Sequence, residues 1–168
     1  MNPETAFQVD ENVERIRNAM HELLIRDQDL LLVDVHERTI MHKIAEYLRS
    51  LFHEWDVDCE YNRDGHEPKR IMLPFHPRFN PNDKPTREVS PDIIIHKRRS
   101  DNNLIAIEIK KSSNKDSEEF WFDKVKLQKY LQNLHYRMSV FIVVNTDSTL
   151  GQPYTLERIT LEHRLLPE

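Results

Sequence analysis

Three charged side chains in the middle of the chain are of the types that phosphodiester hydrolysis needs. Asp92 begins a short apolar segment, and Glu108 and Lys110 lie near the end of the next one. Two carboxylates can hold a hard divalent cation such as Mg²⁺, and an ammonium group can steady an attacking water or a phosphate. If the fold brings the two segments together, these residues indicate a metal-dependent phosphodiesterase.

The two apolar segments are predicted to pair as a hairpin. Residues 92–96 and 104–109 are short apolar runs separated by a polar turn. Side chains alternate between the two faces of a strand, so Glu108 and Lys110 share one face and the neighbouring isoleucines take the other. Antiparallel pairing would bring Asp92 close to both charged residues.

These residues also carry a family resemblance. Pro91-Asp92 followed by Glu108-Ile109-Lys110 resembles the motif of the PD-(D/E)XK nuclease superfamily, which includes restriction endonucleases, Holliday-junction resolvases and phage-type exonucleases. The resemblance implies an α/β fold with a restriction-endonuclease-like αβββαβ core, in which a central mixed sheet is flanked by helices.

The resemblance also implies a role for each motif residue. Asp92 and Glu108 would bind Mg²⁺ or Mn²⁺, with the carbonyl of Ile109 as a further ligand. Lys110 would orient the attacking water or help to deprotonate it. A purely structural interpretation stands beside this one, because Glu-x-Lys is common on the wet face of a half-buried strand and Pro-Asp is ordinary turn chemistry.

Glu37 is a further candidate catalytic residue. Its neighbours predict an amphipathic helix that is capped by Asp34 and runs to about Phe52, with a buried stripe formed by Met41, Ile44, Ala45, Leu48 and Phe52. Glu37 should face inward, and it matches the glutamate that superfamily members often carry on their first core helix. The alternative is a capping box, in which Glu37 only stabilises the start of the helix.

Two candidate substrate-binding residues lie outside the hairpin. Lys126 is on a helix predicted for residues 117–134, where the superfamily commonly has a polar residue that supports the site. It shares a helix face with Asp123 and with Tyr130 of the apolar side, so a surface ion pair with Asp123 is the alternative. Glu60 lies in an alternating strand near the hairpin, and a solvated strand face is its alternative.

Basic side chains are expected on both sides of the hairpin and would contact phosphates: Lys97, Arg98, Arg99, Lys111 and Lys115. Such contacts position a substrate without reading its sequence. His96 faces the same side of its strand as Asp92 and is a candidate for substrate contact. Its alternative is a solvent-exposed histidine at the end of a strand.

The length predicts a single domain over residues 1–168, with a core at about 34–145 and an N-terminal helical extension over 1–33. The extension is predicted to contain a helix from Asp10 to Arg26. A buried strand is expected at 139–145, and a last strand or strapping segment after it. Five prolines interrupt the stretch from 63 to 88, where the apolar residues Ile71, Met72, Leu73 and Phe75 should anchor it on the core.

The composition excludes several classes of protein. Two glycines are too few for the phosphate loop of P-loop or Rossmann proteins and for a serine nucleophile elbow. The single cysteine rules out an internal disulfide framework and fits a reducing compartment. Apolar runs are far shorter than a bilayer span, so we expect a cytoplasmic protein without a membrane partner.

The sequence favours a metal-dependent nuclease that hydrolyses DNA phosphodiester bonds, and a homodimer would suit the cutting of two strands. The alternative is a catalytically silent module of nuclease fold that binds a protein or nucleic-acid partner. The three motif residues favour the enzyme. The net charge of -5 favours the module, because nucleic-acid binders usually present a basic surface.

Overall fold

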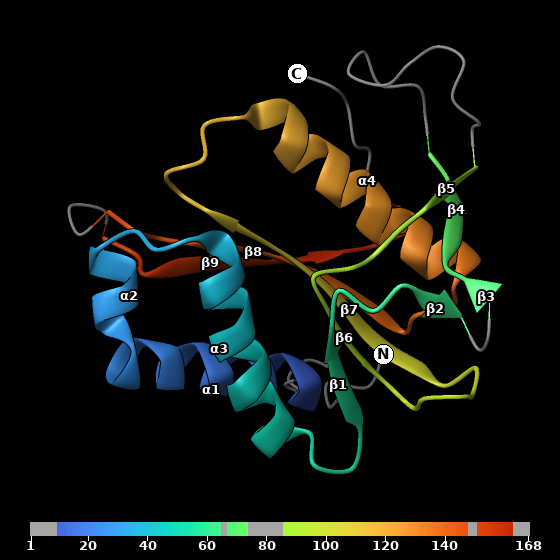
Figure 1. The fold of residues 1–168 in the computed structure, drawn as a ribbon, viewed down its shortest axis with the longest axis horizontal. Helices are drawn as coiled ribbons and strands as arrows, with labels where there is room; N and C mark the ends of the chain where they lie inside the picture. Colours follow the sequence, from blue (N-terminus) through green and yellow to red (C-terminus); the bar gives the residue numbers. More distant parts are fainter. Residues whose placement is uncertain (1–9, 65–66, 74–85, 148–150, 163–168) are drawn as a thin grey trace, which may run out of the picture.

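A computed structural model of the protein describes residues 10–64, 67–73, 86–147 and 151–162. These residues form a mixed five-stranded sheet with helices packed on both faces (Figure 1). The predicted α/β class and the mixed sheet flanked by helices are therefore confirmed.

The sheet has the strand order β1-β6-β7-β8-β9. Its strands are β1 (Asp56–Cys59), β6 (Ile93–His96), β7 (Asn103–Lys111), β8 (Met138–Val144) and β9 (Tyr154–Ile159). Neighbouring strands are antiparallel except β7 and β8, which are parallel. Helix α4 (Ser117–Asn133) makes the crossover between this parallel pair, as a parallel connection requires.

Three helices lie on the other side of the sheet from α4 (Figure 1): α1 (Glu11–Arg26), α2 (Gln28–Leu32) and α3 (Glu37–Leu51). Helix α1 begins where the sequence predicts, because the Asp10 carboxylate accepts a hydrogen bond from the Asn12 backbone N–H at 3.1 Å. Helix α1 packs on α3, and α3 packs on β1 and β7.

Alternate side chains of the isoleucine-rich strands point to opposite faces of the sheet, so the strands contribute to the hydrophobic core on each face. Ile105, Ile107 and Ile109 of β7 are fully buried against the side covered by α1 and α3, whereas Ala106 is buried with residues of α4. This is the alternation predicted from the sequence, and it places the side chain of Glu108 on the α4 side. The predicted hairpin, the helix at 117–134 and the buried strand at 139–145 are all present.

The start of α3 differs from the prediction. The N-cap is His36, whose Nδ1 accepts from the Arg38 backbone N–H at 3.3 Å, and Glu37 is the first helical residue. Asp34 adopts a positive φ of 47°. Its carboxylate accepts hydrogen bonds from Lys111 and a serine after β7, so it fastens the loop before α3 to the sheet rather than capping the helix.

The proline-rich stretch forms two small ribbons from β2 (Arg63–Asp64), β3 (Glu67–Pro68), β4 (Arg70–Met72) and β5 (Thr86–Glu88). As predicted, Ile71 and Leu73 are buried in the core beneath α4, although the side chain of Met72 is exposed. Phe75 lies outside the described residues. Of the predicted final segment, Tyr154–Ile159 forms edge strand β9.

Lys69 attaches these ribbons to the core through an ammonium group that is almost completely buried. Only 1% of the residue is exposed, and Nζ donates hydrogen bonds to the Tyr136 hydroxyl at 2.9 Å and the Tyr61 carbonyl at 3.3 Å. The ammonium also lies over both tyrosine rings, which attract a cation. Burial nevertheless lowers the pKa of Lys69 from 10.5 to about 8.

This buried lysine predicts a rise in stability with pH. Between the pKa values of about 8 in the folded protein and 10.5 in the unfolded chain, the unfolded chain binds more protons, so the free energy of unfolding increases with pH. The expected slope is about 1 kcal/mol per pH unit. Urea denaturation across this window should show the slope in the parent and in the control Lys129→Met, whose lysine is only partly buried, but not in Lys69→Met. Equal slopes in all three proteins would contradict the prediction.

Candidate active site

Strand β7 extends beyond strand β6, and two carboxylates take the place of the missing neighbour. The last residue of β7 that pairs with β6 is Ile107. Beyond it, Asp92 Oδ2 accepts a hydrogen bond from the Ile109 backbone N–H at 2.7 Å, and Glu37 Oε2 accepts one from the Lys111 N–H at 3.2 Å. These two side chains thus satisfy backbone N–H groups of β7 that a longer strand β6 would otherwise bind.

The predicted approach of Asp92 to the end of β7 is therefore present. The N–H and the C=O of one strand residue point to the same side of the strand. The carbonyl of Ile109 accordingly faces the side on which Asp92 lies. The predicted role of this carbonyl as a metal ligand beside Asp92 requires this orientation.

Helix α4 brings three polar side chains to Glu108, which is 1% exposed. Glu108 Oε1 accepts a hydrogen bond from the Tyr130 hydroxyl at 3.0 Å and forms an ion pair with Lys126 Nζ at 3.0 Å. Lys126 Nζ also lies 2.7 Å from Asp123 Oδ1. These three residues share one helix face, as their spacing predicts. The ion pair between Asp123 and Lys126 is not a surface pair. Asp123 is buried, and Lys126 also pairs with the buried Glu108.

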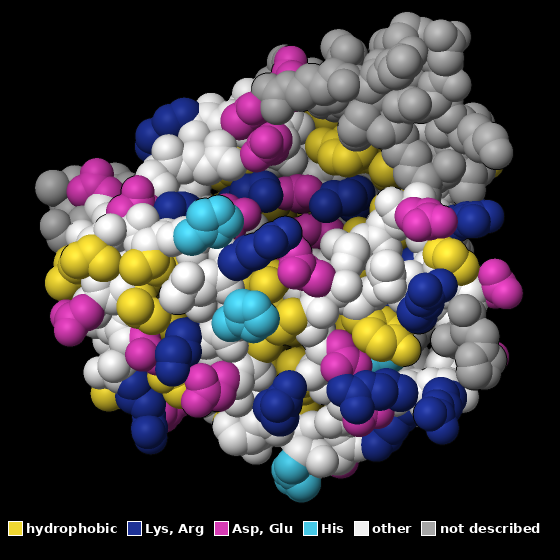
Figure 2. All heavy atoms as spheres, viewed as in Figure 1, with side chains coloured by type: hydrophobic (Ala, Val, Ile, Leu, Met, Phe, Trp, Pro, Cys, Tyr) yellow, Lys and Arg dark blue, Asp and Glu magenta, His cyan; other side chains and the backbone are white. Residues whose placement is uncertain are grey.

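Lys110 joins the two helical layers. Its Nζ lies 3.3 Å from Glu37 Oε1 at the start of α3 and 3.0 Å from Asp123 Oδ2 on α4. We refer to the connected group as the charged cluster: Glu37, Asp92, Glu108, Lys110, Asp123 and Lys126. In the space-filling view, side chains of both signs lie side by side between α3 and α4 (Figure 2).

A pocket of about 210 Å³ adjoins the charged cluster and is lined by His36, Glu37, Arg38, Met41, Glu60 and Asp92. Glu60 lies at this pocket but not within the cluster, because its carboxylate pairs with Arg38 at 3.0 Å. Glu60 follows strand β1 and has a positive φ of 47°, and its backbone N–H donates to the Asp92 carbonyl at 3.0 Å. Glu37 and Asp92 therefore connect the buried charges to the protein surface.

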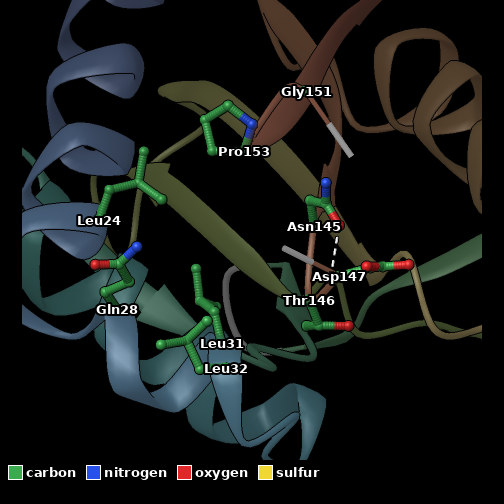
Figure 3. A pocket seen from close by; sticks show the side chains of 9 residues that line it. All are labelled: Leu24, Gln28, Leu31, Leu32, Asn145, Thr146, Asp147, Gly151 and Pro153. Carbon is green, nitrogen blue, oxygen red and sulfur yellow. Dashed lines mark hydrogen bonds between the residues drawn. The ribbon is translucent and has the colours of Figure 1, made fainter. Parts of the chain in front are cut away.

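A second, larger pocket of about 270 Å³ lies elsewhere (Figure 3). It is formed between helices α1 and α2 and the connection from β8 to β9, and its lining is Leu24, Gln28, Leu31, Leu32, Asn145, Thr146, Asp147, Gly151 and Pro153. None of the lining residues belongs to the charged cluster, and Asp147 is the one ionisable residue in this lining. The larger volume therefore does not make this pocket the candidate active site.

His96 and Arg98 lie at the opposite end of the hairpin from Asp92. His96 follows Asp92 by four positions, which corresponds to about 13 Å along a strand. His96 Nε2 and Arg98 Nε both bind Asp58 Oδ2 at 2.8 Å, and His96 is 4% exposed, so it is not the solvent-exposed histidine of the alternative. The two residues join β1 to the hairpin and do not reach the charged cluster.

Lys111 lies next to the cluster but points away from it. Its Nζ binds Asp34 Oδ1 and the Val35 carbonyl, each at 2.9 Å, and so holds the loop before α3. Lys97 and Lys115 likewise bind backbone carbonyls close to them. Of the predicted phosphate contacts, four are thus engaged in local structure: Lys97, Arg98, Lys111 and Lys115.

The charged cluster carries more negative than positive charge. When all of its four carboxylates are ionised, the two ammonium groups leave an excess of two negative charges. Burial raises the pKa of Glu108 well above 4.5, and nearby Asp92 and Asp123 add to this while Lys126 opposes it. Burial likewise raises the pKa of Asp92, although the hydrogen bond from Ile109 opposes the change.

Both lysines of the cluster stay protonated at neutral pH. Burial works to lower the pKa of Lys110, but the carboxylates of Asp123 and Glu37 outweigh it and raise that pKa. The pKa of Lys126 is raised in the same way, with burial opposed by Glu108 and Asp123. A protonated Lys110 does not accept a proton from water, so of its two predicted roles the raised pKa favours orientation of the water.

Sequence reasoning missed Asp123 and Tyr130 as residues of the site. Both were visible on one helix face with Lys126, but Tyr130 fitted the apolar side and Asp123 fitted a surface ion pair. Asp123 Oδ2 is buried, and Lys110 Nζ lies 3.0 Å from it. The signal that could have identified both is their spacing on a helix that follows the Glu-x-Lys strand.

Among the described residues, no three His, Cys, Asp or Glu side chains are arranged as a group that could hold a metal ion. The contacts give the reason, because the ammonium groups of Lys110 and Lys126 each lie between two carboxylates.

No family model, curated protein or solved structure matches the chain. None of the helices described above combines the length and the hydrophobicity needed to cross a bilayer.

Removal of the Tyr130 hydroxyl should destabilise the protein in a pH-dependent way. Tyr130→Phe leaves Glu108 without its hydroxyl donor, so we expect the free energy of unfolding to fall by about 1.5–3 kcal/mol at neutral pH. The loss should be smaller at acidic pH, because a protonated Glu108 depends less on that donor. Urea denaturation at both pH values measures this, with Tyr154→Phe on β9 as the control. A loss that is independent of pH would contradict the prediction.

Proposed function

We propose that this protein is a metal-dependent nuclease that hydrolyses phosphodiester bonds of DNA. The observation that carries the proposal is the convergence of Asp92, Glu108 and Lys110 at one end of the hairpin, where burial perturbs both carboxylates. Strongly shifted pKa values beside an accessible pocket are typical of active sites.

The chain order supports a restriction-endonuclease-like core. Helix α3, the antiparallel strands β1, β6 and β7, helix α4 and the parallel strand β8 follow one another in the αβββαβ order. In this interpretation the ribbons β2 to β5 are an insertion, α1 and α2 precede the core, and β9 adds a strand at its edge.

The donor atoms in the cluster are of the kind that a hard divalent cation prefers. All the candidate ligands are oxygens, which suit Mg²⁺ or Mn²⁺. With all four carboxylates ionised, the excess of two negative charges favours an added cation. Asp92 and Glu108 would hold it, together with the Ile109 carbonyl, and it would supply Lewis acidity and lower the pKa of bound water.

Other residues of the cluster act on the substrate or on the ligands. Lys110, which stays protonated, offsets the charge that develops on the phosphorane, a term that commonly dominates such reactions. Glu37 accepts hydrogen bonds from both Lys110 and the Lys111 backbone, which fixes it for orienting the attacking water. Tyr130 and Lys126 hold the Glu108 carboxylate in place.

Arg38 takes the phosphate-binding role that the sequence assigned to the basic residues around the hairpin. It lines the pocket with Asp92 and Glu37, and 69% of its side chain is exposed. Its exposed ion pair with Glu60 is weak enough for a phosphate to replace the carboxylate. Glu60 is then the residue that holds Arg38 at the pocket before substrate arrives.

A silent module of nuclease fold is the second candidate. It is favoured by the lysines that already neutralise half of the carboxylates, and by the net charge of -5. Such a module would bind a protein partner with little dependence on salt, whereas a nuclease would lose DNA affinity steeply as salt increases.

The cleavage experiment separates the two candidates. Linear duplex, single-stranded and branched DNA are incubated with Mg²⁺ or Mn²⁺ and with the parent, Asp92→Asn or Lys110→Met. We expect cleavage by the parent, no detectable cleavage by Asp92→Asn, and a loss of about 10²- to 10³-fold for Lys110→Met. Asn at position 92 keeps an oxygen for the Ile109 N–H, so the fold should persist.

Two substitutions of the same types serve as controls. Asp101→Asn lies in the turn at the far end of the hairpin, and Lys129→Met lies on the exposed side of α4. Both should cleave like the parent. If no protein cleaves any substrate with either metal, the silent module is the better interpretation.

Metal binding should release protons. Because burial raises the pKa of Glu108 and Asp92, part of their population is protonated at mildly acidic pH, and a cation must displace those protons. Mn²⁺ affinity should therefore weaken as the pH falls. Calorimetry in two buffers of different ionisation enthalpy should show the release in the parent and a smaller one in Glu108→Gln. A binding heat that is the same in both buffers would count against a protonated Glu108.

A further inference from the structure

Hydrophobic side chains are exposed where helix α1 meets helix α2. In the described part of the chain, three exposed large hydrophobic side chains fall within residues 25–33: Ile25 (64% exposed), Leu32 (56%) and Val33 (71%). Hydrophobic side chains gather over α2 on the left of the space-filling view (Figure 2). Single exposed apolar residues are ordinary, but a group of them beside a pocket is typical of an interaction site.

The larger pocket adjoins these side chains and has an apolar wall on its helical side (Figure 3). Leu24 of α1 and Leu31 and Leu32 of α2 line it, together with Pro153 from the connection between β8 and β9. Its volume of about 270 Å³ is smaller than the roughly 300–1,000 Å³ of pockets for drug-sized ligands, so it suits a single protruding side chain. We refer to these four residues and Val33 as the α2 surface.

The α2 surface has an acidic border. Residues 22–34 contain four acidic side chains and one basic side chain, Arg26. Lys43 and Lys111 reach this stretch from other elements, and the pocket residue Asp147 adds a further carboxylate. Acidic side chains of this border therefore outnumber basic ones by five to three. A partner with basic residues beside an apolar face would complement both properties of the surface.

We propose that the α2 surface binds a basic amphipathic helix of a partner protein, with one apolar side chain of that helix seated in the pocket. Such a helix presents apolar residues on one face and basic residues beside them, which matches leucines bordered by carboxylates. The border disfavours two other occupants. A second copy of this chain would bring acidic borders together, and an anionic membrane would be repelled. The inference is independent of the proposed nuclease activity.

Binding of a synthetic peptide tests the apolar part of the inference. The probe is a fluorescein-labelled peptide of leucine and lysine patterned as an amphipathic helix, and its counterpart has glutamate in place of lysine. Fluorescence anisotropy should show that the parent binds the lysine peptide and not the glutamate peptide. We expect binding to weaken about 10-fold in Leu32→Ser and in Val33→Ser, as for anchors of an interface. The control Met72→Ser, which changes a similarly exposed side chain on β4, should bind like the parent.

The acidic border is tested with the lysine peptide and a pair of matched substitutions. Asp29→Asn removes one exposed carboxylate of the border, and Asp101→Asn removes one from the turn of the hairpin. At low salt we expect Asp29→Asn to weaken binding about 2- to 5-fold and Asp101→Asn to have no effect. The difference should shrink at high salt, where exposed charges are screened.

The other outcomes overturn the inference. These are no binding of the lysine peptide to the parent, equal binding by the parent and both serine variants, or equal binding of the two peptides. Sedimentation that shows a dimer in the parent and a monomer in Leu32→Ser would assign the surface to a second copy. Flotation with phosphatidylserine vesicles that depends on Leu32 would assign it to a membrane. Both substituted side chains are exposed, so folding should persist. Urea denaturation checks this, and if one serine variant unfolds, the other decides the test.

Discussion

The site depends on the two backbone N–H groups of β7 that extend beyond β6. A buried donor without a partner costs a free energy comparable to a lost hydrogen bond. Asp92 and Glu37 accept from the Ile109 and Lys111 N–H groups, so the fold requires side-chain oxygen acceptors at this edge. Once they are there, Lys110 has carboxylates on both sides of the sheet edge, and its ammonium links α3 to α4. The same hydrogen bonds thus serve folding and the proposed chemistry.

Burial of so much charge is tolerated because the charges are paired within the cluster. Breaking a buried pair by removal of one partner leaves an uncompensated ion, which is far more costly than the pair itself. Asp123 is central to this balance, since its two oxygens face two different lysines. The pairing of Asp123 with both lysines therefore keeps the two ammonium groups and the buried carboxylates in fixed positions relative to one another.

The sequence predicts those parts of the structure that depend on local periodicity. The alternation in β7, the continuous apolar run of β8 and the amphipathic pattern of α4 each follow from neighbouring residues. Contacts between distant segments were not predictable in the same way. Arg98 is close to Asp92 in sequence, but an antiparallel hairpin places its turn at the far end, where Asp58 of β1 binds the guanidinium. The partners of Asp123 likewise come from other elements, so its role became visible only in three dimensions.

Asp92 has a further consequence for how such a protein could change over time. Its backbone hydrogen bond needs an oxygen acceptor, whereas the proposed chemistry needs a negative charge. An amide side chain meets the first requirement and not the second. A single nucleotide change from aspartate to asparagine would therefore give a folded protein without catalysis, and selection could retain it as a binding protein. One substitution that replaces a single side-chain oxygen by nitrogen could therefore convert one of the two functions considered for this chain into the other.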